Sequence, residues 1–232
     1  MKQLLIGFVS GKGGAGKSSI TQAVATTMNK FYDLKVGIID VDSQQSIFNL
    51  RKKEIKNFKE NQVIIKELMD LKKRGKKVYD INSAEPTDLK MIAQIKSQND
   101  ITFIDMPGSL SVPGVKELYF FLDYAFIPFY VDELSYQSDR ETLLMVKEMH
   151  DSGKSRLKGY GVFFNRYSER KNKVQFDALE EQFNKVNIPI LAPVYENIKM
   201  QREYCTTIKA ISDNMTPKSI HRLIENLLTQ IK

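Results

Sequence analysis

The sequence contains few of the residues that build disulfides or metal centres. Its 232 residues include one cysteine, Cys205, and two histidines, His150 and His221, which lie far apart along the chain. A single cysteine excludes an internal disulfide and fits a reducing compartment. No group of cysteines or histidines has the spacing of a metal site. We therefore expect a cytoplasmic protein whose function depends on other side chains.

The sequence also lacks a long hydrophobic run. The longest apolar stretch, LYFFLDYAFIPFYV at residues 118–131, is interrupted by Asp123 and is too short to cross a bilayer. The apolar run near the N-terminus leads into a glycine-rich loop and not into a small-residue cleavage site. We therefore expect neither a membrane span nor a signal peptide.

Negative charge is in deficit, because 35 Lys and Arg residues outnumber 28 Asp and Glu residues and give a net charge of +7. Residues 51–77 alone carry eleven Lys or Arg and four Asp or Glu, and a second basic stretch covers residues 154–173. Such segments attract nucleic acid or an anionic membrane, and they also occur as solvated helix faces. The charge by itself leaves these alternatives open.

Short apolar runs alternate with longer helical patterns along the chain. The short runs predict buried strands at residues 4–9, 35–40, 101–105, 124–131 and 159–165, and weaker strands at 78–81 and 190–195. The longer patterns predict helices at about 17–31, 45–74, 87–97, 134–150, 173–187 and 217–231. This alternation predicts an α/β fold, a mainly parallel twisted sheet with helices on both faces. Because no linker or repeat is visible, we expect a single domain over residues 1–232.

A glycine-rich loop follows the first predicted strand. Gly11 to Ser18, GKGGAGKS, match the phosphate-loop pattern G-x-x-x-x-G-K-[ST] between a predicted strand and a predicted helix. Glycines let backbone N–H groups approach phosphate oxygens, and the N-terminus of the following helix adds partial positive charge. In such a loop Lys17 would contact the β and γ phosphates, and the Ser18 hydroxyl would ligate Mg²⁺. The motif predicts a three-layer P-loop NTPase fold.

Aspartates end two of the predicted strands. Asp40 and Asp42 follow the second strand, and Asp105 ends ITFID. The carboxyl ends of parallel strands form the edge where ligands of open α/β sheets bind, so these carboxylates are candidates to hold a metal ion and orient water. A strand-end aspartate is also a common turn or helix N-cap residue, and this alternative stays open for each one. Gly108, close after Asp105, would let its loop respond to a γ-phosphate.

These motifs together resemble those of a known family. KGGAGKSS resembles the deviant Walker A motif, K-G-G-x-G-K-[ST]-[ST], of the ParA/MinD class of P-loop ATPases. DVDSQQS resembles the D-x-D-P-Q segment of that class, and FIDMPGSLS its Walker B and switch II segments. The resemblance runs in order from residue 4 to about 131, and it is closest to the small ParA-like proteins of plasmids and conjugative elements. Ser43, where the family usually has proline, and DMPG, in place of D-T-P-P, depart from the pattern.

The resemblance implies a role for the second lysine of the loop, Lys12. In this family two monomers face each other with ATP between them, and this lysine reaches the phosphates of the partner's nucleotide. A cation there would stabilise the departing γ-phosphoryl group as an arginine finger does. The catalytic residues implied are Lys12, Lys17 and Asp42, of which Asp42 positions the attacking water. The metal residues implied are Ser18, Asp40 and Asp105, with ATP and Mg²⁺ as cofactors.

The resemblance also implies a nucleotide-binding set. Asn165 resembles the adenine-reading position, although a strand-end asparagine can instead be a plain cap. Pro193, together with residues 195–201, resembles the loop that closes over the base. The whole implied set is Gly11, Lys12, Gly13, Gly14, Ala15, Gly16, Lys17, Ser18, Ser19, Asn165 and Pro193.

Missing chemistry sets several branches of this class aside. Branches that bridge an iron–sulfur cluster need cysteine pairs, which one cysteine cannot supply. MinD-like membrane binding needs a terminal amphipathic helix. Residues 217–231 have a broad aliphatic face and a mixed polar side, which is more typical of a core helix. Membrane binding is therefore not expected.

What remains is a DNA-partition ATPase. Its ATP-bound homodimer would bind DNA non-specifically, associate with the nucleoid and hydrolyse ATP slowly until a partner protein stimulates it. The alternative is a MinD-like positioning switch that acts on a membrane or protein complex without touching DNA. The candidate phosphate contacts are Arg51, Lys52, Lys53, Lys72, Lys73, Arg74, Arg170, Lys171 and Lys173.

Overall fold

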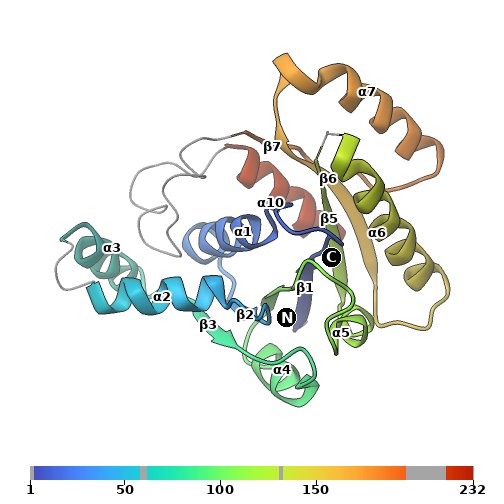
Figure 1. The fold of residues 1–232 in the computed structure, drawn as a ribbon. Helices are drawn as coiled ribbons and strands as arrows, with labels where there is room; N and C mark the ends of the chain where they lie inside the picture. Colours follow the sequence, from blue (N-terminus) through green and yellow to red (C-terminus); the bar gives the residue numbers. More distant parts are fainter. Residues whose placement is uncertain (1–2, 58–61, 131–132, 197–217, 232) are drawn as a thin grey trace.

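The computed structural model describes residues 3–57, 62–130, 133–196 and 218–231. Within these residues the chain forms a seven-stranded sheet in which every pair of neighbouring strands is parallel, in the order β3-β2-β4-β1-β5-β6-β7 (Figure 1). The strands are β1 (Leu4–Phe8), β2 (Val36–Asp40), β3 (Asp80–Ser83), β4 (Ile101–Asp105), β5 (Tyr124–Phe129), β6 (Gly159–Tyr167) and β7 (Val194–Tyr195). The helices are α1 (Lys17–Phe31), α2 (Ser46–Asn57), α3 (Gln62–Lys73), α4 (Leu89–Lys96), α5 (Val115–Phe121), α6 (Glu133–Asp151), α7 (Glu169–Lys185) and α10 (Lys218–Gln230).

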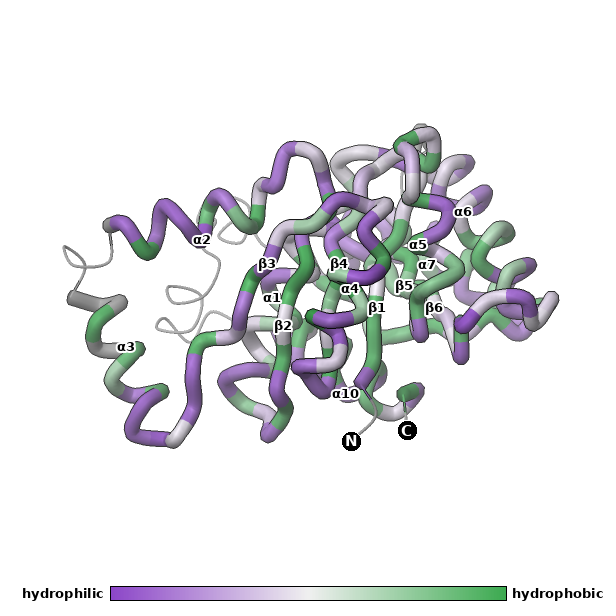
Figure 2. Tube along the Cα trace, turned by 90° about the horizontal axis from the view of Figure 1, so that it is seen from below, coloured by the Kyte–Doolittle hydropathy of each residue, from purple (hydrophilic) through white to green (hydrophobic). Residues whose placement is uncertain are grey.

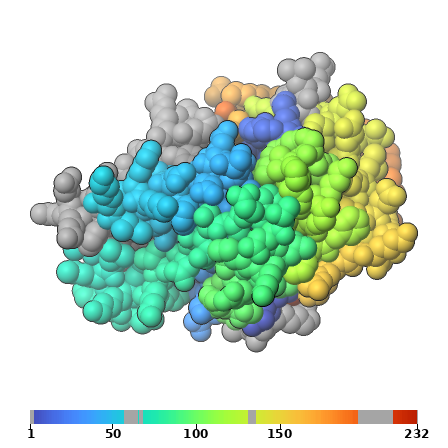
Figure 3. Space-filling view, turned by 60° about the horizontal axis from the view of Figure 1, so that its bottom comes forward, coloured from blue at the N-terminus to red at the C-terminus, as the bar shows by residue number. Residues whose placement is uncertain are grey.

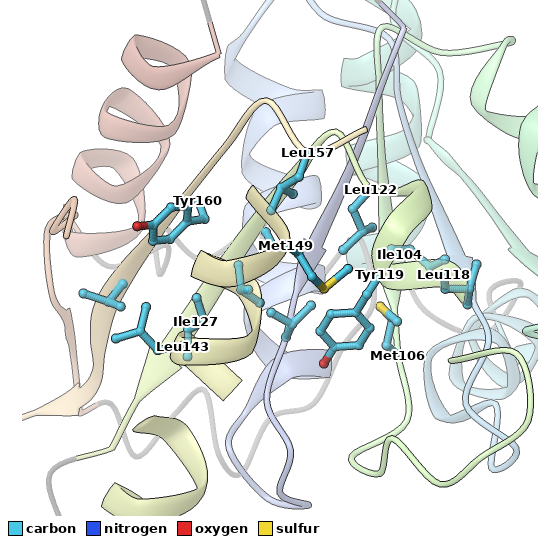
Figure 4. Close-up of a cluster of buried hydrophobic side chains, with 14 of the residues drawn as sticks. Ile104, Met106, Leu118, Tyr119, Leu122, Ile127, Leu143, Met149, Leu157 and Tyr160 are labelled. Atoms are coloured by element: carbon cyan, nitrogen blue, oxygen red, sulfur yellow. The ribbon is translucent and has the colours of Figure 1, made fainter. Parts of the chain in front are cut away.

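Helices cover both faces of the sheet, and each face has its own apolar core. Side chains of α1, α2 and α10 pack on one face. Side chains of α4, α5, α6 and α7 pack on the other, where Leu118 and Tyr119 of α5 and Leu143 and Met149 of α6 meet the sheet (Figure 4). Because both faces are covered, the central strands are continuous apolar runs, which appear green in Figure 2. The predicted three-layer α/β fold is confirmed.

The register of the sheet brings the predicted site segments together. Asp40 at the end of β2 pairs with Asp105 at the end of β4, and Asp105 pairs with Phe8 at the end of β1. The chain then leaves β1 into the glycine loop and re-enters the fold as α1. Three segments that lie far apart in sequence therefore end at one level of the carboxyl edge of the sheet.

Several predicted boundaries differ from the structure. In place of the single helix expected over residues 45–74, the structure has α2, which ends at Asn57, and α3, which begins at Gln62. Helix α5 was not predicted, because its aromatic residues merge with the apolar run of β5. Strand β3 begins at Asp80 and not at residue 78, and Tyr79 before it is buried with its hydroxyl 3.0 Å from Thr26 Oγ1 of α1.

The last helix is a core helix, as predicted. Ile220, Leu223, Ile224 and Leu227 of α10 are fully buried. They pack in the core that also holds α1, so the aliphatic face of this helix is occupied within the chain. Among the described residues, no helix combines the length and the apolar composition that a membrane span requires.

Candidate functional site

The glycine loop between β1 and α1 borders a pocket of about 440 Å³. Gly14 and Gly16 both have φ of 83°, a left-handed conformation that only glycine adopts without strain. The pocket is lined by Gly13, Gly14, Gly16, Lys17, Ser18, Ser19, Asp42, Gln44, Ser46, Asp105, Met106, Gly108 and Arg166. Most of the loop and two of the three strand-end aspartates thus meet around one cavity.

Lys17 is the first residue of α1, is buried and lines this pocket. Its ammonium group donates a hydrogen bond to the carbonyl oxygen of Lys12 at 3.1 Å. Burial lowers the pKa of Lys17, and the nearby carboxylates, Asp105 and Asp42 foremost, oppose this effect. A buried cation surrounded by backbone N–H groups of a glycine loop is suited to bind a polyanion.

Asp105 ends β4 and is almost completely buried at the same pocket. Burial raises the pKa of Asp105 to about 7, although a hydrogen bond from Ser18 opposes the shift. Its Oδ1 atom is buried and has no hydrogen-bond partner among the described residues. A buried carboxylate oxygen without a partner is costly unless a cation binds it.

These groups fit a magnesium ion. The Asp105 carboxylate and the Ser18 hydroxyl are adjacent, and Asp42 lines the same pocket. The described residues contain no group of three His, Cys, Asp or Glu residues that could hold a metal ion alone. Mg²⁺ needs no such group, because it usually combines one or two carboxylates with substrate phosphates and water. The predicted role of Ser18 and Asp105 in metal binding remains a prediction that this chemistry supports.

Asp40 occupies a different position from the one its predicted metal role implies. Its Oδ2 accepts hydrogen bonds from the backbone N–H groups of Ile47 at 3.0 Å and Phe48 at 3.1 Å, in the first turn of α2. Its Oδ1 accepts one from the N–H of Asp42 at 3.3 Å, and the residue does not line the pocket. The structure therefore supports the helix-cap interpretation that the sequence left open, and contact with the metal shell remains a prediction.

Asn165 also holds backbone in place. Its Nδ2 donates to the carbonyl oxygen of Ala15 at 2.9 Å, and its Oδ1 accepts the N–H of Arg166 at 3.0 Å. Neither Asn165 nor Pro193, which is half-buried just before β7, lines the pocket. Their adenine-contacting roles remain predictions, and residues 197–201 of the expected base-covering loop lie outside the described residues.

Arg166 lines the pocket and was not predicted. Its backbone is left-handed with φ of 54°, which is uncommon for a residue other than glycine and often occurs at functional sites. Its Nη2 lies 3.5 Å from the carbonyl oxygen of Gly14, and its guanidinium lies 5.7 Å from the centre of the Tyr130 ring. The only signal in the sequence was its place directly after Asn165, at which the sequence predicts the strand to end, whereas β6 continues to Tyr167.

The first residues of the glycine loop, Gly11 to Gly13, pack tightly against other segments. A Cβ atom at Gly108 would lie 2.8 Å from the backbone N of Gly13, so the loop after β4 rests directly on the glycine loop. The N–H of Gly11 donates to Thr142 Oγ1 at 2.9 Å, and the N–H of Lys12 donates to Ser10 Oγ at 3.2 Å. Lys12 is half-buried and does not line the pocket of its own chain.

The basic residues predicted to contact DNA divide into two groups. Arg51 forms the first group, because it contacts Tyr79 within the fold. Its Nη1 donates to the carbonyl oxygen of Tyr79 at 2.9 Å, and its guanidinium lies 4.9 Å from the centre of the Tyr79 ring. The helix that carries it, α2, lies on an exposed face of the molecule (Figure 3). The exposed members of the predicted set are Lys52, Lys53, Lys72, Lys73, Arg74, Arg170, Lys171 and Lys173.

Comparison with known proteins agrees with this geometry. The family described as the CobQ/CobB/MinD/ParA nucleotide binding domain matches residues 6–209. No curated protein matches the chain. A plasmid partition protein from Borrelia burgdorferi is similar in structure, with a TM-score of 0.65 and 20% identity over 99% of this chain and 100% of that one. The MinD cell division protein of Aquifex aeolicus has a TM-score of 0.68 and 20% identity over 98% and 97% of the two chains. Apo McdA from Cyanthece has a TM-score of 0.64 and 14% identity over 99% of both chains.

Proposed function

Because the chain belongs to the CobQ/CobB/MinD/ParA nucleotide-binding domain family, we propose that it is an ATPase that dimerises around ATP. We further propose that the dimer binds DNA non-specifically and serves partition or maintenance of a plasmid or conjugative element. The observation that carries this proposal is the pocket in which Lys17, the Ser18 hydroxyl and the unpartnered oxygen of Asp105 meet at the glycine loop. A solved structure of a similar partition protein from Borrelia burgdorferi is bound to AMPPNP, an ATP analogue.

The residues of the pocket divide the work of hydrolysis. The N–H groups of the glycine loop and Lys17 would hold the phosphates, while Ser18 and Asp105 would hold Mg²⁺. When bound, Mg²⁺ neutralises charge on the β and γ phosphates. Asp42, which lines the pocket together with Gln44, orients the attacking water. Asp40 acts indirectly, because it holds the backbone of Asp42 and the start of α2.

The proposed dimer depends on Lys12. Its side chain does not line the pocket of its own subunit, whereas its backbone is fixed beside it. A cation supplied by the partner subunit would stabilise the departing γ-phosphoryl group and link ATP binding to dimerisation. We expect slow turnover in the isolated protein and stimulation by a partner protein, since a fast ATPase could not maintain its ATP-bound state.

The exposed lysines of α2 and the residues after it supply the DNA surface. Lys52 and Lys53 are exposed residues of α2, Lys72 and Lys73 end α3, and Arg74 follows it. No element has the geometry of a sequence reader in the part of the chain that is described, so binding would depend on phosphate contacts and fall steeply with salt. The exposed lysines support this choice over a positioning switch, since the fold is similar to that of a plasmid partition protein and to that of MinD alike.

Light scattering tests the dimer and the DNA surface together. We expect a monomer with ADP, a dimer with a non-hydrolysable ATP analogue, and retention of DNA by that dimer, lost at about 0.3–0.5 M salt. Lys52→Gln combined with Lys53→Gln should weaken DNA retention, whereas the matched control, Lys90→Gln combined with Lys116→Gln, removes two exposed lysines elsewhere and should not. A monomer in every nucleotide state would refute the dimer. A dimer that ignores DNA would favour positioning of a protein complex.

Two variants separate the roles within the pocket. Asp42→Ala should leave ATP binding intact and accumulate the ATP-bound dimer, because it removes the group that orients water. Lys12→Ala should leave ATP affinity of the monomer within about twofold while it reduces dimerisation and turnover. Loss of dimerisation in Asp42→Ala, or full turnover in Lys12→Ala, would contradict the assigned roles.

A further inference from the structure

The end of β6 contacts the glycine loop with two successive side chains. Nδ2 of Asn165 donates a hydrogen bond to the carbonyl oxygen of Ala15 at 2.9 Å. Nη2 of Arg166 lies 3.5 Å from the preceding carbonyl oxygen, that of Gly14. A Cβ atom at Gly16 would lie 2.6 Å from Asn165 Nδ2, so this amide rests directly on the glycine. Residues that are 150 positions apart in the sequence are therefore in contact here.

A register shift in β6 directs both side chains to the loop. Asn165 pairs with Val194 of β7, and Tyr167 pairs with the next residue of that strand. Arg166 is therefore an extra residue, as in a β-bulge, and its backbone is left-handed with φ of 54°. Neighbouring side chains of a regular strand point to opposite faces, whereas Asn165 and Arg166 both reach carbonyl oxygens of the glycine loop.

The amide of Asn165 is fixed in its orientation. Its Oδ1 accepts the N–H of Arg166 at 3.0 Å, while its Nδ2 donates to the carbonyl oxygen of Ala15. A flipped amide would set an N–H group against the N–H of Arg166 and an oxygen against the carbonyl oxygen, so neither hydrogen bond could form. Asn165 is 5% exposed and does not line the pocket. Its side chain therefore acts on the backbone of the loop.

The hydrogen bond to Ala15 sets the direction of a loop N–H group. The peptide group that links Ala15 and Gly16 is trans, so its C=O and its N–H point in opposite directions. Asn165 holds the C=O from outside the pocket, and Gly16, which carries the N–H, lines the pocket. Gly16 also directly precedes α1, and its carbonyl oxygen accepts the N–H of Ile20 at 2.9 Å. The same contact thus positions the N-terminus of α1, where N–H groups are suited to bind phosphate.

The end of β6 is anchored more firmly than the loop that it contacts. Tyr167 is buried, and its ring centre lies 4.8 Å from that of Phe176 and 5.3 Å from that of Tyr195. The loop contains two glycines with left-handed backbone, and glycine has the widest conformational freedom of any residue. An anchor outside the loop therefore reduces the ordering that phosphate binding would otherwise require.

We propose that Asn165 is a positioning residue for phosphate binding, which orients the peptide group between Ala15 and Gly16 and the start of α1 toward the phosphates. This inference rests on the proposed nucleotide site and deepens it. N–H groups that are already oriented bind an anion at a lower entropic cost than groups that must first be ordered. The role differs from reading of the base, because the effect of Asn165 extends to a ligand that has no base.

The test measures the binding of ATP and of inorganic tripolyphosphate, each with Mg²⁺, by isothermal titration calorimetry. Tripolyphosphate presents a chain of three phosphates without ribose or base. Asn165→Ala should weaken the binding of both ligands by the same factor, about tenfold, which is the typical net effect of one hydrogen bond.

Asn29→Ala is the matched control. Asn29 is also buried, and its Nδ2 also donates to a backbone carbonyl oxygen, that of Lys77 at 3.1 Å, near the opposite end of α1. This variant should lose stability and keep native affinity for both ligands. Equal losses of affinity in the two variants would show a general effect of stability and overturn the inference.

Asn165→Ser, whose side chain is too short to reach the carbonyl oxygen of Ala15, should show the same losses and replaces Asn165→Ala if that variant folds poorly. A loss confined to ATP would assign Asn165 to the base, and unchanged affinity for both ligands would remove it from binding. Either result would overturn the inference while the proposed function stands, as would native protein that binds ATP but not tripolyphosphate. If the native protein binds neither ligand, the proposed nucleotide site fails, and this inference with it.

Discussion

Two buried aspartates at opposite edges of the sheet differ in how their charge is compensated. Asp123, at the amino edge, accepts hydrogen bonds from Lys96, from Lys158 at 2.6 Å and from the N–H of Leu5 at 2.8 Å. Burial tends to raise the pKa of Asp123, but these hydrogen bonds outweigh burial and lower it. Asp105, at the carboxyl edge, keeps an oxygen without a partner, and burial raises its pKa to about 7.

The comparison separates groups that stabilise the fold from groups that await a ligand. A buried carboxylate with every oxygen occupied contributes to stability, whereas one with an unoccupied oxygen reduces stability until a cation binds. The carboxyl edge also buries Lys17 with a lowered pKa, a second group that is poorly compensated inside the chain. Perturbed groups of this kind cluster at functional sites.

The largest expected effect is at the carboxyl edge. Lys17→Ala should weaken ATP binding by a factor of about a thousand, roughly 4 kcal/mol, because it removes the buried cation from the phosphate site. The free energy of unfolding without nucleotide should not fall, since the lysine is buried at a cost. Isothermal titration calorimetry and urea unfolding check the two parts. Native-like affinity would show that the pocket is not the phosphate site.

At the amino edge a substitution should lower stability and leave ATP binding unchanged. Asp123→Asn leaves Lys96 and Lys158 without their carboxylate and should lower the free energy of unfolding by about 3 kcal/mol. Because the pKa of Asp123 is lowered, its ionised form stabilises the fold at pH values above the ordinary aspartate pKa. The difference in the free energy of unfolding between the native protein and Asp123→Asn should therefore become smaller as the pH falls below about 4. ATP affinity of the folded protein should be unchanged. A clear loss of affinity by calorimetry would mean that the two edges are not separable in this way.

Removing the charge of Asp105 should stabilise the nucleotide-free protein, whereas Asp123→Asn should destabilise it. Asp105→Asn should raise the free energy of unfolding of the nucleotide-free protein by about 2 kcal/mol at pH 8. The pKa of about 7 lies above that of the unfolded chain, so ionisation costs stability as the pH rises from about 4 to 7 and the gain should shrink toward pH 4. Thermal unfolding across this pH range measures it. A variant less stable than the native protein at pH 8 would contradict the comparison.

The smallest effect concerns the arginine that the sequence did not predict. Arg166→Ala should weaken ATP binding by about three- to tenfold, roughly 1 kcal/mol, because Arg166 lines the pocket but is only half-buried, unlike Lys17. Arg170→Ala, at an exposed position of α7, serves as the control and should retain native affinity. Equal affinities of the two variants would remove Arg166 from the site.

Much of the fold could be predicted because its signals are local. Short apolar runs became the central strands, and the apolar face of residues 217–231 became the buried face of α10. The errors occurred where one signal covered two elements. The run at 118–131 hid the end of α5 beside β5, and the helical pattern at 45–74 is described as two helices.

The candidate site was predictable to the extent that its residues are contiguous. The glycine loop carries its own conformational requirement, and its lysine and serine follow in fixed order, so the motif identified them directly. The roles of Asp40 and Asp105 could not be separated, because both end apolar strands in the same way. Only the neighbours decided that Asp40 holds the first turn of α2 while Asp105 keeps a free oxygen in the pocket.

The sequence by itself determined the glycine loop, the parallel sheet and the edge of that sheet at which the acids gather, since each depends on residues close together in the chain. Tertiary structure alone decided which polar groups are compensated and which are not. Arg51 donates a hydrogen bond to the carbonyl oxygen of Tyr79, and Asp139 accepts one from Ser10, which precedes the glycine loop and lies 129 residues away in the sequence. The physical reason is that the energy of a buried polar group depends on the partners that the fold brings to it, and those partners lie many residues away.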